Sequence, residues 1–156
     1  MAVRVQREAF DAAAEAQALV AGRSDVGSVV TFTGLVRGEA GGRPLKSLTL
    51  EHYPEMTEAE LSRIEGEARE RFALADCLVI HRFGELVPGD PIVLVVTLSA
   101  HRHAAFAAAE FLMDYLKSRA PFWKKEAFAD GTESWVDARE TDDAALARWA
   151  GSATQK

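Results

Sequence analysis

Residues 77–98 read CLVIHRFGELVPGDPIVLVVTL. The apolar runs Cys77–Phe83 and Pro91–Leu98 are typical of buried strands, and the GELVPGD between them supplies turn chemistry. Residues 99–118, SAHRHAAFAAAEFLMDYLKS, follow directly. Their apolar side chains recur at helical spacing and form one stripe, which consists of Ala105, Ala109, Leu112, Met113 and Leu116. Two strands followed by an amphipathic helix predict a core that mixes α and β structure.

Further elements are predicted on both sides of this core. The expected strands are Val3–Gln6, Ser28–Val36, Lys46–Tyr53, Phe122–Phe128 and Glu133–Ala138. The expected helices are Glu8–Ala21, a helix of about four turns that starts at a capping box of Thr57 and Glu60, and Asp142–Trp149. We expect Lys46–Tyr53 to be the hairpin partner of Ser28–Val36, and the last two strands to form a second hairpin. Helices combined with antiparallel hairpins predict an α+β fold.

Composition and charge limit the classes of function. The 156 residues, 48% of them apolar, suit one domain over residues 1–150 with a disordered tail at 151–156. A net charge of −6 argues against general affinity for nucleic acid or anionic membranes. No apolar run approaches the length of a membrane span, and the N-terminus lacks a signal peptide, so we expect a cytoplasmic protein. The single cysteine, Cys77, lies in an apolar run and is interpreted as a buried structural thiol.

A cluster of basic residues stands out against this acidic background. His101 and Arg102 directly follow a predicted strand, so they should lie at the N-terminus of the next helix, where unpaired N–H groups and the helix dipole favour an anion such as phosphate. Lys117 lies at the edge of the apolar stripe of the same helix, where partial burial would favour a neutral amine able to accept a proton or act as a nucleophile. The alternative is a surface ion pair between Asp114 and Lys117.

The residues after this helix extend the basic cluster. If Phe122–Phe128 is a strand, Lys124 and Lys125 point to opposite faces, and only one of them can face Lys117. Arg37, at the end of the VVTFTGLVR strand, is either a phosphate clamp or a solvated loop residue. We interpret His52 and His81 as core histidines. His101 and His103 have no clear third ligand, so no metal site is expected.

Six ordered motifs resemble one enzyme family. They are VVTFTGLVR, LTLEHYPEMTE, VIHRFGELVPGD, SAHRHAAF, MDYLKSRAPFWKKE and WVDARETD, and they extend from about Gly27 to Trp149. Together they resemble the large, catalytic subunits of molybdopterin synthases. The resemblance implies an α/β hammerhead-type fold with an additional antiparallel β subdomain.

The same resemblance implies an activity and partners. The expected reaction transfers sulfur to cyclic pyranopterin monophosphate and forms the dithiolene of molybdopterin, with no cofactor. The expected sulfur donor is the C-terminal Gly-Gly thiocarboxylate of a small ubiquitin-like carrier subunit. The expected assembly is a homodimer that binds two carriers, a heterotetramer. Because Cys77 is expected to be buried, the chain has no evident persulfide carrier of its own, which fits an external sulfur source.

Site roles follow from the matched motifs. The resemblance implies that Lys117 in MDYLKSRAP is the essential catalytic lysine and that Lys124 in FWKKE is the second. Arg37, His101 and Arg102 match substrate-contacting positions, and Lys125 and Glu126 adjoin them. The family often has Lys-Arg-Glu where this chain has Lys124-Lys125-Glu126, a change that keeps the charge but loses a bidentate guanidinium. Two alternatives stay open: another transferase acting on a small anion, and a non-catalytic subunit that binds a ubiquitin-like partner.

Overall fold

A four-stranded sheet forms the centre of the computed structural model, which describes residues 2–136, 140–147 and 149–150. Its strands are β1 (Ala2–Gln6), β5 (Asp76–Arg82), β7 (Pro91–Ser99) and β2 (Ser28–Leu35), in the order β1-β5-β7-β2. The strands β5 and β7, which their apolar sequences predicted, pair in antiparallel fashion. β1 runs parallel to β5, and β2 runs antiparallel to β7. The two edges of this sheet are therefore β1 and β2.

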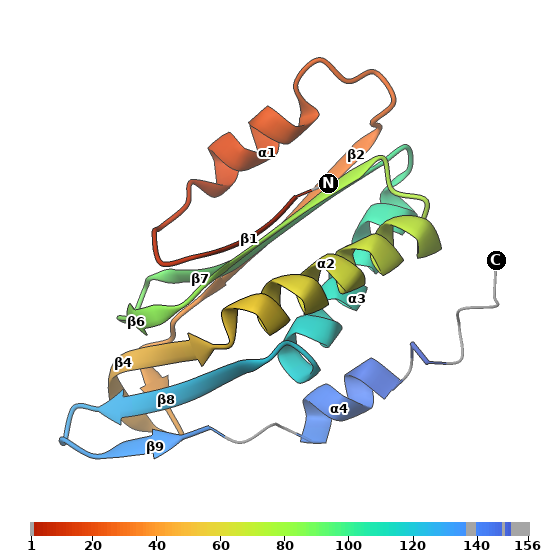
Figure 1. Cartoon of the computed structure of the whole chain (residues 1–156). Helices are drawn as coiled ribbons and strands as arrows, with labels where there is room; N and C mark the ends of the chain where they lie inside the picture. Colours follow the sequence, from red (N-terminus) through yellow and green to blue (C-terminus); the bar gives the residue numbers. More distant parts are fainter. Residues whose placement is uncertain (1, 137–139, 148, 151–156) are drawn as a thin grey trace.

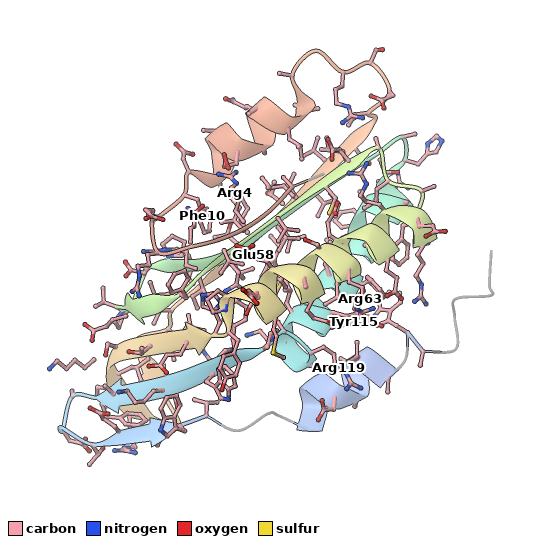
Figure 2. The ribbon with its side chains drawn as sticks, in the orientation of Figure 1. Arg4, Phe10, Glu58, Arg63, Tyr115 and Arg119 are labelled. Atoms are coloured by element: carbon pink, nitrogen blue, oxygen red, sulfur yellow. The ribbon has the colours of Figure 1, made fainter. Side chains whose placement is uncertain are left out.

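Helices cover both faces of this sheet, which explains why its central strands are almost wholly apolar. The helix α1 (Ala12–Val20) packs on one face, while α2 (Pro54–Arg71) and α3 (Arg102–Ser118) cover the other (Figure 1). Leu78, Ile80 and Leu94 face α1, and Val79 and Val95 pack under α2 and α3. Figure 2 shows Arg4 reaching from β1 toward α1, where it pairs with Glu15. The four-stranded sheet is therefore covered by two apolar core layers, one on each of its faces.

A second sheet extends the molecule beyond the lower end of α3 as drawn in Figure 1. It contains β3 (Glu39–Ala40), β4 (Arg43–His52), β8 (Phe122–Phe128) and β9 (Glu133–Trp135), in that order, with β6 (Gly84–Leu86) also paired to β4. The predicted hairpin between Ser28–Val36 and Lys46–Tyr53 is wrong, because β2 pairs with β7, whereas β4 pairs with β3, β6 and β8. The hairpin of β8 and β9 is confirmed. The helix α4 (Glu140–Ala147) packs against α3.

The start of α2 corrects another expectation. The helix begins at Pro54, with Tyr53 as its N-cap and proline in the first turn, where a missing N–H costs nothing. Thr57 is therefore inside the helix, and its hydroxyl donates to the Tyr53 carbonyl at 2.8 Å instead of capping. The predicted capping box of Thr57 and Glu60 is wrong. α1 is also shorter than expected, since Asp11 caps it by accepting a hydrogen bond from the Ala14 N–H.

The α+β prediction is confirmed, with the additional antiparallel sheet that the resemblance implied. Cys77 is fully buried, as expected. Among the described residues, no helix combines the length and apolar content needed to cross a bilayer. The expected tail at 151–156 lies outside the described residues, as do positions 137 and 138 of the last predicted strand.

Candidate active site

A pocket of about 400 Å³ opens between the two sheets at the C-terminal end of α3. Its walls come from the end of β2, the inner face of β4 and β8, and the last turn of α3. Its charged and hydroxyl side chains are Arg37, Glu39, Lys117, Ser118, Lys124 and Glu126. Apolar side chains that include Leu45, Ile92 and Phe122 form the rest of the wall. Three cations and two carboxylates thus converge on one cavity in a chain that is acidic overall.

The alternation of β8 decides which of its residues face the pocket. Lys124 and Glu126 line it, together with Phe122. Lys125 lies on the opposite face, where its ammonium pairs with the Glu133 carboxylate at 3.3 Å and lies 5.9 Å from the ring centroid of Trp135. The prediction that only one of the two adjacent lysines can face Lys117 is confirmed, and that residue is Lys124. Lys125 therefore does not contribute its side chain to this pocket.

Lys117 reaches the pocket from the last turn of α3, but it is exposed and not partly buried as its position beside the apolar stripe suggested. The stripe itself is confirmed, with Ala105, Ala109, Leu112 and Leu116 buried. The alternative of an ion pair between Asp114 and Lys117 is wrong, since no such pair is found among the described residues. Asp114 instead accepts a hydrogen bond of 2.6 Å from the Trp149 indole. Lys117 is thus positioned at the site by the last turn of α3.

His101 and Arg102 lie where the sequence placed them, at the start of α3. His101 is the N-cap of this helix and Arg102 is its first residue. Close contacts fix this junction: the Gly27 N–H donates to the Ser99 carbonyl at 2.9 Å, and a Cβ added to Gly27 would lie 2.1 Å from the Ala100 carbonyl oxygen. The junction therefore has a defined backbone geometry.

The three expected phosphate contacts do not come together within one chain. Arg102 and Lys117 are separated by most of α3, about 22 Å at 1.5 Å per residue. Arg37 follows the Leu35 end of β2, whereas the register of β2 with β7 places His101 beside the Ser28 end, about 23 Å away along the strand. Within one chain, Arg37 therefore lies too far from His101 and Arg102 for the three side chains to hold one phosphate. Only Arg37 lines the pocket with the lysines.

Two histidines lie behind the pocket wall. His81 is a buried core residue, as the sequence predicted, whereas His52 is only half-buried, which corrects the prediction for that residue. His81 is 5% exposed, and its Nδ1 lies 2.9 Å from the Arg82 carbonyl oxygen. Burial, with smaller contributions from the nearby Lys124 and Lys117 charges, lowers the pKa of His81 to about 3. His52 contacts the Thr57 hydroxyl through Nδ1 at 3.0 Å, and burial lowers its pKa as well. Both imidazoles are therefore neutral at pH 7.

The family model described as "MoaE protein" matches residues 5–119, which include the strands β2, β5 and β7, the helix α3 and Lys117. The chain belongs to the MoaE family. The molybdopterin synthase catalytic subunit from Mesorhizobium japonicum is 61% identical to this chain over 151 residues, which are 96% of this chain and 94% of the relative.

Solved structures agree with the MoaE assignment. The MoaE protein from Burkholderia ambifaria MC40-6 is 51% identical, superposes with a TM-score of 0.81, and covers 96% of this chain and 98% of that one. A complex of subunits 1 and 2 of molybdopterin-converting factor from Helicobacter pylori 26695 is 20% identical, with a TM-score of 0.70 over 88% of this chain and 90% of that one. The second likeness shows the fold alone.

Two polar residues of the pocket, Glu39 and Ser118, were not identified as site residues from the sequence. Glu39 lies in the Gly-rich segment GEAGGRP, where it starts the short strand β3, which folds back on β4. Ser118 is an ordinary helix-terminal residue, and spacing alone carries no signal for it. Within the described part of this MoaE-family chain, no three His, Cys, Asp or Glu side chains gather to hold a metal ion.

Proposed function

We propose that this chain is the catalytic subunit of a molybdopterin synthase and transfers sulfur to cyclic pyranopterin monophosphate in the pocket described above. The observation that carries the proposal is the convergence of Arg37, Lys117, Lys124 and Glu126 from three separate segments on one cavity. Relatives that are more than half identical over nearly the whole chain are named molybdopterin synthase catalytic subunits. These are also the residues that the family motifs marked.

The chemistry of the pocket suits this reaction. A guanidinium on Arg37 can hold the substrate phosphate through charge-assisted hydrogen bonds. The amines of Lys117 and Lys124 can donate and accept protons while each sulfur adds to the pterin side chain. They can also stabilise the charge that develops when water attacks the carrier's carbonyl carbon, the C–S bond breaks, and the sulfur stays on the pterin while the carrier leaves as a carboxylate. Glu126 lies on the same wall as Lys124 and supplies a carboxylate that can accept a proton or orient an amine. Lys125 serves at most an indirect role, since its side chain is on the other face.

An external sulfur donor fits the state of the one cysteine. Cys77 is fully buried in the sheet, and burial raises the pKa of its thiol well above the ordinary value, so it forms no nucleophilic thiolate at pH 7. The proposal therefore assigns sulfur delivery to the thiocarboxylated diglycine tail of a small ubiquitin-like carrier. Glycines, having no side chains, suit a narrow entry. The proposal keeps the cytoplasmic location expected from the sequence.

A second copy of the chain would complete the site. The strand β2 is a sheet edge with exposed apolar side chains, and Val29 and Phe32 are 43% and 42% exposed. Such edges are rarely left open, and symmetric dimers commonly cover them. If two β2 strands pair in antiparallel fashion about a two-fold axis, the Ser28 end of one copy lies beside the Leu35 end of the other. His101 and Arg102 of one copy would then approach Arg37 and Lys117 of the other, so we propose a homodimer that binds two carriers.

Reconstitution tests the proposed function. The purified chain is mixed with cyclic pyranopterin monophosphate and with a small carrier that bears either a C-terminal thiocarboxylate or an ordinary carboxylate. We expect molybdopterin only with the thiocarboxylate. Product formation from free sulfide at the same rate without any carrier would instead indicate a different small-anion transferase. Tight carrier binding without product from any donor would indicate a non-catalytic subunit.

A further inference from the structure

His81 lies directly behind the wall of the pocket. It belongs to β5, its side chain is 5% exposed, and the sequence motifs assigned it no role beyond the core. Its imidazole stacks on the ring of Phe122, with centroids 3.8 Å apart and planes inclined by 18°. Phe122 is the first residue of β8 and lines the pocket, two positions before Lys124 on the same face of the strand. One face of a pocket-lining ring thus rests on His81.

A hydrogen bond fixes the orientation and protonation of this imidazole. Its Nδ1 lies 2.9 Å from the Arg82 carbonyl oxygen, and because a carbonyl can only accept, Nδ1 must carry the proton. Nε2 is then the unprotonated nitrogen. Burial keeps the ring neutral, and the lysine charges nearby reinforce this, since a third cation beside them would be unfavourable. The ring is therefore a rigid, uncharged support in a region that carries two ammonium groups.

We propose that His81 is a positioning residue for the reaction, which sets the placement of Lys124 by holding the ring of Phe122 against the core. This inference rests on the proposed function for its kinetic consequence, but the placement itself can be measured without sulfur transfer. His52 provides a contrast. It also lies near Phe122, but its ring is 5.7 Å away and inclined by 35°, and its closer aromatic neighbour is Phe83 at 4.4 Å.

The test replaces His81 by Leu, which is apolar but cannot stack, and by Phe, which keeps a flat ring. His52→Leu is the matched control. The first readout is the rate at which an amine-reactive ester labels each lysine, measured by peptide mass spectrometry. Lys125 is the internal reference, because it shares the strand with Lys124 but faces the other way. The second readout is the split between kcat and KM in reconstituted sulfur transfer, well below the unfolding temperature.

We expect His81→Leu to speed labelling of Lys124 at least threefold while Lys125 stays within experimental error. We also expect kcat to fall about tenfold to a hundredfold with KM for the carrier unchanged, because a lysine displaced by about an ångström loses its catalytic alignment. His81→Phe should restore both values, and His52→Leu should leave both near wild type. If His81→Leu fails to fold, Phe122→Leu removes the same stack from the other side and should give the same change at Lys124.

Unchanged labelling of Lys124 in the folded variant that lacks the stack would overturn the proposal, whatever happens to activity. Failure of His81→Phe to restore the labelling rate would overturn it as well. If the wild-type chain shows no sulfur transfer at all, the proposed function fails. The labelling ratio of Lys124 to Lys125 still decides whether His81 positions the pocket lysine.

Discussion

Mixed dimers would show whether one catalytic site is built from two copies of the chain. The structure places Arg102 about 22 Å from Lys117 along α3, so the two side chains cannot act on one small substrate within one chain. Arg102→Ala alone should lower activity about tenfold to a hundredfold, the usual value of a charge-assisted contact to phosphate. Lys117→Ala alone should lower it by on the order of a hundredfold or more. Each homodimer is then nearly inactive at both of its sites.

A dimer with one copy of each variant behaves differently if the sites are shared. One of its two sites combines an intact Lys117 with the intact Arg102 of the other copy, and the second site lacks both. Co-expression with two different affinity tags isolates this mixed dimer. Its specific activity should be about half that of wild type, far above either parent, because one of two symmetric sites is restored. Activity no higher than the mean of the two parental dimers would refute the shared site and the β2 pairing from which it was inferred.

Three further predictions concern the edge strand, the helix junction and a buried carboxyl. Phe32→Glu places a charge on the exposed apolar edge β2, and sedimentation should show a monomer where wild type is a dimer. Gly27→Ala forces a Cβ against the Ala100 carbonyl and should lower the free energy of unfolding by about 1–3 kcal/mol in urea titrations; an unchanged value would mean that the junction adjusts at no cost. Burial raises the pKa of Glu65, so the native chain holds this proton after the unfolded chain has lost it, and wild-type stability should fall as pH rises above the ordinary glutamate value. Glu65→Gln should remove that decline, and parallel pH profiles of the two proteins would contradict this reading.

The parts of the fold that depend on local pattern could be predicted from the sequence. The apolar runs of β5 and β7 identify strands buried on both faces, and the spacing in α3 identifies its buried stripe. The alternation of β8 correctly separates Lys124 from Lys125. In each case the side-chain period determines the answer, and no information on distant residues is needed.

The errors arise where distant segments meet. β4 has the pattern of a hairpin strand, but pattern alone does not reveal that its partners are β8 and β6 and not β2. Thr57 and Glu60 have the spacing of a capping box, yet Pro54 allows α2 to begin one turn earlier. Arg37 follows the end of β2 and His101 follows the end of β7. Only the register of β2 with β7 shows that these two residues lie at opposite ends of β2. Direction and register come from tertiary pairing.

The most direct measurement of the central claim is single-turnover molybdopterin formation by Lys117→Ala and Lys125→Ala, side by side, with thiocarboxylated carrier in excess. Lys117 lies in the last turn of α3 and Lys125 lies in the neighbouring strand β8, but of these two lysines only Lys117 lines the pocket. With both variants folded and dimeric, we predict that Lys125→Ala stays within about threefold of wild type, the size expected for a residue outside the reacting groups, and that Lys117→Ala loses on the order of a hundredfold or more. Near-normal product formation by folded Lys117→Ala would contradict the assignment of this pocket as the catalytic site.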